Sequence, residues 1–260
     1  MKERKAGKKS PLKAKPLRNP GETLDNQIRD IFLDDVVMYF MIALPAVILA
    51  MFEWLRWYNQ SPPNPWLFTV IASVAVTVAA YKIRSALAKV PLLKAGRDGE
   101  KAVGQYLESL RRDGAEIFHD VPGDGFNVDH VIIHASGVYA VETKILAKPV
   151  RGEARLIFDG QTIRNGAFTP DRNPVVQVSA AATWLRELLK NSTGQTIPVR
   201  PVVVYPGWFI EPTAEARSSS VWVLNPKALP SFIGHSAEQL RKDQVQLCAF
   251  HLGRYVRAIP

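Results

Sequence analysis

The chain has 260 residues, of which 47% are hydrophobic and 22% are charged, so it is long and apolar enough to bury a core. The lone cysteine, Cys248, excludes an intrachain disulfide framework and a multi-cysteine zinc site, and it is expected to be a small core residue of a helix. The formal net charge is +9, but this charge is spread unevenly along the chain.

Positive charge is concentrated at the N-terminus. Residues 1–18 carry eight Lys and Arg and one acid, a net charge of +7. We expect residues 1–35 to form a basic, largely disordered tail. Such a tail can bind anionic lipid or nucleic acid.

Two apolar segments follow the tail. Residues 36–52 and 66–81 are 17 and 16 residues long and contain no charge. Each spans roughly 25 Å as a helix, and flanking Trp and Tyr residues can complete a crossing of a hydrocarbon core of about 30 Å. The sequence therefore predicts two transmembrane helices, at about 36–58 and 65–82, joined by a Pro-rich link. A buried helix pair in a soluble core fits less well, because neither segment has a polar face.

The charges beside these segments predict their orientation. Residues 82–94 carry four Lys and Arg and no acid, so both outer flanks of the hairpin are positive. This pattern predicts a multi-pass protein of the cell (inner) membrane with both termini in the cytoplasm and a juxtamembrane linker at 83–95. Residues 96–260 hold 19 basic and 17 acidic residues, a net charge of +2. The high overall charge is thus weak support for a DNA-binding face.

Helix and strand patterns alternate in the cytoplasmic part. They predict a helix at 97–112, strands at 115–119, 127–133 and 138–144, a hairpin at 155–164, a helix from Asn173 to about Gly194, strands at 199–205 and 221–224, and a terminal helix capped by Ser236 and Gln239 that runs to about Val256. This order predicts an α/β (α+β) domain.

Two carboxylates and an ammonium group are expected to meet on one face of the predicted sheet. Strand side chains alternate, so Glu142 and Lys144 project together. If residues 134–137 form the turn, Asp129 lies opposite Glu142, with their β-carbons about 5 Å apart. A divalent cation would offset that repulsion, and oxygen ligands select Mg²⁺ or Mn²⁺ over zinc. Lys144 would then hold an anionic substrate or orient a metal-bound water, although Asp129 could instead pair with Lys144.

Glu100 and Gln177 are the other polar candidates. Glu100 lies at the edge of the apolar stripe of the helix at 97–112 and is expected to face the sheet, or else to meet the helix dipole as a first-turn acid. Gln177 lies on the same helical face as Trp184, where a buried amide requires polar partners, or else it caps or bonds the backbone. His130 is expected to point to the other face of the sheet as a buried or hydrogen-bonded side chain.

Four sequence blocks resemble the nuclease-related domain, NERD, a branch of the PD-(D/E)xK nuclease superfamily. They are GRDGE at 96–100, NVDHVII at 127–133, GVYAVETK at 137–144 and NPVVQV at 173–178. The resemblance covers residues 96–206 and implies a restriction-endonuclease-like αβββαβ core. It leaves residues 207–260 as a C-terminal extension of strand and helix packed on the domain.

The resemblance also implies the chemistry, which is metal-dependent hydrolysis of phosphodiester bonds in DNA or RNA. Asp129 and Glu142 would hold Mg²⁺ or Mn²⁺, with Glu100 tuning the site or holding a second ion. Lys144 would position the attacking water, and Gln177 would orient the substrate or Lys144. The competing hypotheses are an inactive module that binds nucleic acid or anionic lipid, and a membrane scaffold.

Overall fold

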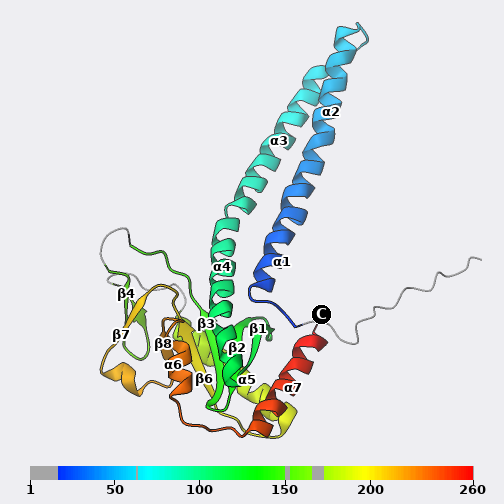
Figure 1. The fold of residues 1–260 in the computed structure, drawn as a ribbon. Helices are drawn as coiled ribbons and strands as arrows, with labels where there is room; N and C mark the ends of the chain where they lie inside the picture. The colour runs from blue at the N-terminus through cyan, green and yellow to red at the C-terminus, as the bar shows by residue number, and fades with distance from the viewer. Residues whose placement is uncertain (1–16, 63, 150–152, 166–172, 260) are drawn as a thin grey trace, which may run out of the picture. The chain divides into compact units, whose positions relative to one another are not determined.

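The computed structural model describes residues 17–62, 64–149, 153–165 and 173–259. The chain divides into two compact units, one comprising Gly21–Asp98 and the other built mainly from Gly99–Pro260 (Figure 1). Most of the predicted basic tail, residues 1–16, and Pro63 of the predicted Pro-rich link lie outside the described residues.

The first unit is helical. Its elements are α1 (Glu22–Asp30), the π-helix η1 (Ile31–Val37), α2 (Met38–Tyr58), α3 (Pro65–Leu87) and the start of α4 (Val90–Leu107). The helical runs that contain α2 and α3 are long and apolar enough to cross a membrane. Only 6% and 11% of their most apolar windows are buried, whereas a helix pair in a soluble core would be mostly covered.

Polar side chains stabilise the link between α2 and α3. Glu53 accepts a hydrogen bond from the Arg56 guanidinium at 2.9 Å and another from the backbone N–H of Asn64 at 2.9 Å. Asn64 in turn caps α3, since its side chain accepts from the N–H of Leu67 at 3.4 Å. These bonds satisfy backbone groups where the chain reverses direction.

Two segments of this unit differ from the sequence prediction. Residues 22–35 are helical in α1 and η1, although they were expected to belong to the disordered tail. The predicted linker at 83–95 is also largely helical, because α3 continues to Leu87 and α4 begins at Val90. Arg97 donates a hydrogen bond to Asp25 at 3.0 Å and forms an ion pair with it. The two residues are 72 positions apart, so the local sequence pattern does not predict this contact.

The second unit contains the predicted α/β domain. After α4 its elements are η2 (Glu108–Asp113), β1 (Glu116–Pro122), β2 (Asn127–His134), β3 (Gly137–Thr143), β4 (Arg155–Phe158), β5 (Ile163–Arg164), α5 (Pro174–Thr193), β6 (Val199–Val204), β7 (Phe209–Pro212), η3 (Glu215–Ser218), β8 (Trp222–Leu224), α6 (Leu229–Gly234) and α7 (Lys242–Ala258). The order α4, β1, β2, β3, α5, β6 confirms the αβββαβ core.

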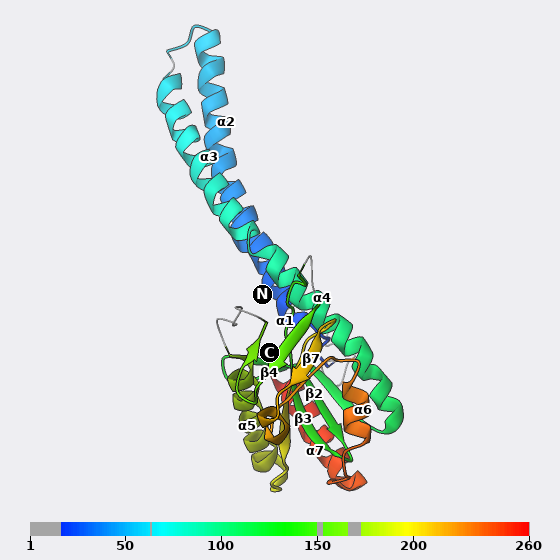
Figure 2. The same cartoon turned by 90° about the vertical axis from the view of Figure 1, so that its left-hand side faces the viewer.

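The central sheet has the order β1-β2-β3-β6-β8. Strands β1, β2 and β3 are antiparallel, while β6 and β8 run parallel to β3. Leu185 of α5 and Leu252 of α7 pack on one face, and Leu107 of α4 and Ile233 of α6 pack on the other. Figure 2 shows α5 and α6 on opposite sides of these strands. A second sheet, β5-β4-β7, includes the predicted hairpin.

The sequence signals at the ends of α5 are confirmed. The Asn173 side chain accepts from the N–H of Val175 at 2.9 Å, Pro174 occupies the first turn, and the helix ends at Gly194 with φ of 72°. Cys248 is fully buried in the core of the second unit, as predicted. The terminal helix is shorter than predicted, because it begins at Lys242 rather than beside Ser236.

Candidate active site

The register of β2 and β3 brings two acids together. Ile133 pairs with Val138 and His130 pairs with Val141, so the next position outward aligns Asp129 with Glu142, as predicted. The turn is tighter than expected, because His134 pairs with Gly137 and only two residues form the loop. The two versions give the same register, so the difference does not move the acids.

Asp129 is half-buried and is held by the backbone of the neighbouring strand. Its Oδ2 accepts a hydrogen bond from the N–H of Thr143 at 2.6 Å. Burial raises the pKa of Asp129 well above its ordinary value, and the negative charges of Glu142 and Glu100 raise it further. Two neighbouring acids therefore act on Asp129.

Glu142 is only 5% exposed and forms the centre of a small polar network. Its Oε1 accepts from Lys144 Nζ at 2.7 Å and from Gln177 Nε2 at 2.8 Å. Gln177 Oε1 in turn accepts from Lys144 Nζ at 3.0 Å, which closes a three-membered ring of contacts. Burial raises the pKa of Glu142, and the Lys144 ammonium opposes that rise.

Lys144 therefore forms hydrogen bonds with Glu142 and Gln177. Among the described residues, its ion pair is with Glu142, and the alternative pair with Asp129 is not formed. Gln177 differs from the prediction in one respect. The residue is exposed rather than buried on the apolar face of α5. Val175 and Val178 of the same part of α5 are buried in the core, whereas the Gln177 side chain contacts Glu142 and Lys144.

Glu100 comes from α4, where it is half-buried. Gly99 beside it allows a close approach, since a Cβ at this position would overlap the side chain of Ile145, directly after Lys144. Glu100 lies close enough to raise the pKa of Asp129. Across the described residues, however, no three His, Cys, Asp or Glu side chains are gathered into one metal-binding cluster.

His130 faces the opposite side of the sheet, as predicted, and is fully buried. Its Nδ1 lies 2.8 Å from Nδ1 of His119, and His119 Nε2 lies 3.2 Å from Glu108 Oε1. Glu108 can only accept, so His119 carries its proton on Nε2 and His130 donates through Nδ1. Burial lowers the pKa of both histidines. The sequence analysis did not single out His119, because it lies on the neighbouring strand, 11 residues from His130.

Tyr205 is a further residue that the sequence analysis did not single out. It is buried at the end of β6, directly after the strand that pairs with β3. Burial and the negative charge of Glu142 raise the pKa of Tyr205 to about 12, so its hydroxyl stays neutral beside the acids. In the sequence, the run of Val residues before Tyr205 indicates a buried strand end, but it does not indicate a place beside the acids.

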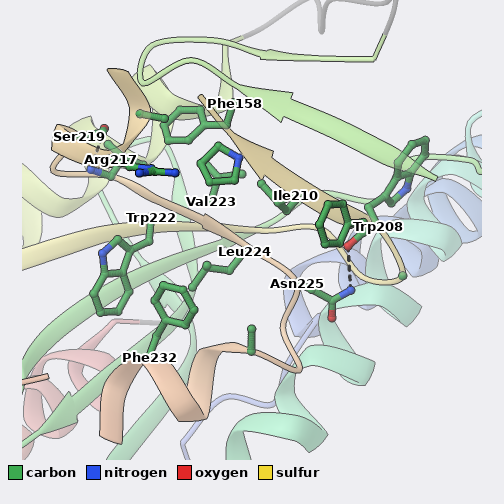
Figure 3. A pocket seen from close by; sticks show the side chains of 16 residues that line it. Phe158, Trp208, Ile210, Arg217, Ser219, Trp222, Val223, Leu224, Asn225 and Phe232 are labelled. Carbon is green, nitrogen blue, oxygen red and sulfur yellow. Dashed lines mark hydrogen bonds between the residues drawn. The ribbon is translucent and has the colours of Figure 1, made fainter. Parts of the chain in front are cut away.

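An apolar cavity of about 590 Å³ lies away from these acids, between β7, β8 and α6 (Figure 3). Its walls include Phe158, Trp208 and Phe232, and its cationic lining residue is Arg217. No Asp or Glu is found among its described lining residues. The acids that the sequence singled out, Asp129, Glu142 and Glu100, do not line it.

Comparison with known proteins supports the sequence resemblance. Residues 95–206 match the sequence profile of the nuclease-related domain, NERD. No curated protein is significantly similar in sequence. Among solved structures, SfsA of Pyrococcus furiosus in complex with Ca²⁺ is 18% identical, with a TM-score of 0.27. That match covers 50% of this chain and 54% of SfsA, about half of its length. The family model thus places the similarity to the nuclease-related domain in residues 95–206 of the chain.

Proposed function

We propose that the chain is a membrane-anchored, divalent-metal-dependent nuclease that hydrolyses phosphodiester bonds of DNA or RNA. The observation that carries this proposal is the convergence of Asp129 and Glu142 from adjacent strands, with the pKa of both groups raised. Two carboxylates that repel each other in a partly buried place fit a bound cation. The Lys144 ammonium beside them completes a set suited to phosphate chemistry.

Mg²⁺ or Mn²⁺ fits the donors that are present. Mg²⁺ is commonly held by one or two carboxylates together with waters and substrate phosphate oxygens, so Asp129 and Glu142 suffice without a third protein ligand. Glu100 tunes the site through its charge on Asp129. When bound, the ion would stabilise charge on the phosphate and lower the pKa of water.

Lys144 and Gln177 supply the other roles. Lys144 Nζ is fixed between Glu142 and Gln177, and it is placed to orient the attacking water or a phosphate oxygen. Gln177 holds both partners at once, so it sets the position of the ammonium relative to the carboxylate. The Thr143 N–H likewise fixes the position of the Asp129 carboxylate through its hydrogen bond to Oδ2. These contacts pre-organise the site before substrate arrives.

The helices α2 and α3 would anchor the enzyme in the cell (inner) membrane. Their apolar side chains remain largely exposed, and the basic segments at 1–18 and 82–94 would keep both termini in the cytoplasm. Trp54, Trp57 and Trp66 cluster at the hairpin end, with ring centres 5.8 Å apart for both Trp54–Trp57 and Trp54–Trp66, as expected for residues at a membrane interface.

One observation favours the competing hypothesis of an inactive module that binds nucleic acid or anionic lipid. Glu142 already has two hydrogen-bond donors on Oε1, so its charge is largely compensated within the protein. A bound ion would therefore have to use Oε2 or displace Lys144. Turnover decides between the hypotheses, because a binding module and a membrane scaffold leave nucleic acid intact.

The test uses the full chain in detergent micelles with labelled single-stranded DNA, duplex DNA and RNA, each with Mg²⁺, Mn²⁺ or EDTA. Cleavage is expected with metal and not with EDTA. Asp129→Asn and Glu142→Gln should lower its rate more than about 100-fold. The exposed acids Asp113→Asn and Glu238→Gln are matched controls that should retain the rate. Equal rates in all four variants would remove the assignment.

A further inference from the structure

Two cavities adjoin along α5, outside the site described above. One, of about 470 Å³, lies between α5, the first residues of β3 and β6, and residues 218–220. The other, of about 930 Å³, continues along α5 to Asn173. They share Ser179, Thr183, Ser219 and Ser220, so they form one continuous channel, here called the α5 groove.

The α5 groove carries positive charge without a counter-ion. Arg186 and Arg200 line it, and its described lining residues include no Asp or Glu. Both arginines are half-buried, and neither forms an ion pair with a described carboxylate. Partly desolvated guanidinium groups in such a place favour an anion with several oxygens, which a guanidinium fork can bind through two hydrogen bonds.

The two guanidinium groups are held in place by neutral partners. Arg186 Nη2 donates to the carbonyl of Val199 at 3.5 Å. Arg200 Nη1 donates to the carbonyl of Ser220 at 3.2 Å, and its guanidinium carbon lies 4.7 Å from the centre of the Trp222 ring. These contacts use few of the five donors on each side chain, so most remain available to a ligand.

An aromatic side chain lines the second cavity of the groove. Trp184 is half-buried there, and its ring meets Phe126 and Tyr255 edge to face, at 5.4 Å and 5.8 Å between ring centres. Grooves that combine cations with a fixed aromatic ring are typical of proteins that bind single-stranded nucleic acid, because bases stack on the ring while cations follow the backbone. A lipid headgroup offers no base for Trp184.

One end of the groove lies near the candidate active site. Gln177 donates its backbone N–H to the carbonyl of Asn173 at 3.2 Å, so Asn173, which lines the groove, lies one helical turn from Gln177. From Asn173 to Arg186 the helix rises about 20 Å.

We propose that the α5 groove binds single-stranded nucleic acid. Arg186 and Arg200 hold backbone phosphates, Trp184 stacks a base, and the strand runs along α5 toward Asp129 and Glu142. The identification of this strand as substrate rests on the proposed nuclease function, whereas the binding itself does not.

The test measures binding without turnover. The full chain in detergent micelles is titrated with fluorescein-labelled oligo-dT and oligo-U of 12 nucleotides in EDTA, by anisotropy over a salt series. The double variant Arg186→Gln/Arg200→Gln should bind at least about 10-fold more weakly at low salt, and its salt slope should fall by about 0.7 for each lost phosphate contact. Trp184→Leu should weaken binding at least about fivefold and leave the slope unchanged, because stacking releases no counter-ion.

The matched control Arg112→Gln/Arg254→Gln removes the same charge from exposed positions outside the groove and should bind like the wild type. Thr183→Glu places an acid at an exposed position of the groove, so it tests the same surface if the arginine variants unfold. Wild-type affinity and slope in both Thr183→Glu and the arginine variant, or equal losses in the control, would overturn the proposal. The same variants are also tested for binding to phosphatidylglycerol vesicles. If they lose binding to the vesicles and keep binding to the oligonucleotides, the proposal is likewise overturned.

The outcomes separate this proposal from the nuclease assignment. If the groove variants lose binding while the wild type cleaves nothing with metal, the groove stands and hydrolysis does not. If Asp129→Asn abolishes cleavage while the groove variants bind normally, the groove assignment fails alone.

Discussion

Gln177 donates to Glu142 at 2.8 Å and accepts from Lys144 at 3.0 Å, so one amide from α5 holds two charged groups from the end of β3. The residue is exposed, and the packing of the core does not depend on it. Gln177 therefore positions the Lys144 ammonium group without contributing much to the stability of the fold. Its role in the proposed reaction can be measured by substitution without unfolding the protein.

Gln177→Leu should lower kcat about 10- to 100-fold, because Lys144 loses a partner that orients it. The thermal midpoint should change little, since the residue is exposed. Steady-state kinetics with Mn²⁺ and circular dichroism melts measure the two effects. Loss of activity with an equal loss of folded protein would mean that the amide is structural.

Asp129→Asn should stabilise the protein in the absence of metal. The raised pKa of Asp129 means that the folded protein retains a proton that the unfolded chain releases above about pH 4, so stability falls as pH rises from there to the folded-state pKa. Asparagine removes this cost and can still accept from the Thr143 N–H. A gain of about 1 kcal/mol or more is expected at pH 8 in EDTA, measured by urea unfolding.

Mn²⁺ should affect the wild type and Asp129→Asn differently. At a concentration of about 100 times Kd it should stabilise the wild type by about 2.7 kcal/mol, and it should leave Asp129→Asn almost unchanged. Thermal melts with and without the ion measure the difference. Equal shifts in both proteins would place the ion elsewhere.

The buried histidine pair should make the domain sensitive to acid. Burial lowers the pKa of His119 and His130, so below about pH 6.5 the unfolded chain takes up protons that the folded protein does not, and stability is lost as pH falls. His130→Gln keeps a donor toward His119 but cannot titrate. The slope of unfolding free energy against pH should decrease by about 1.4 kcal/mol per pH unit for each proton removed, and an unchanged slope would contradict this account.

Gly99→Ala should disturb the site from α4, because the added methyl group would overlap Ile145 beside Lys144. A loss of about 1 to 3 kcal/mol is expected from overpacking, with a fall in activity. Ile145→Ala in the same chain removes the overlapping atoms and should restore both. The double variant is the control, and failure of rescue would mean that Gly99 serves another purpose.

The orientation of the hairpin is tested by labelling. Asn59→Cys at the exposed end of α2 should react with a membrane-impermeant maleimide in intact cells, whereas Glu238→Cys should react only after permeabilisation. Cys248 is fully buried, so it adds little background. The reverse pattern would place the termini on the other side.

The register of β2 and β3 could be predicted from the sequence because the side-chain period in a strand is two and the loop is short. Asp129 and Glu142 therefore fall opposite each other whether the turn has two residues or four. The ends of α5 were equally predictable, since Asn173, Pro174 and Gly194 act locally.

Features that depend on distant residues could not be predicted in this way. The helical residues at 22–35 belong to a unit in which Asp25 meets Arg97, 72 positions away. The exposure of Gln177 depends on which residues of the rest of the domain pack against α5, and a helical wheel does not contain that information. The α5 groove combines α5 with residues 218–220, and no periodic pattern links them.

Because Gln177 and Arg186 stand nine residues apart on one unbroken helix, they lie about 14 Å apart along its axis and about half a turn apart around it. A fragment shorter than this cannot be gripped and cut at once. The rigid helix would thus set a minimum length for the substrate. Digestion should slow once the products approach that length, leaving short oligonucleotides rather than single nucleotides.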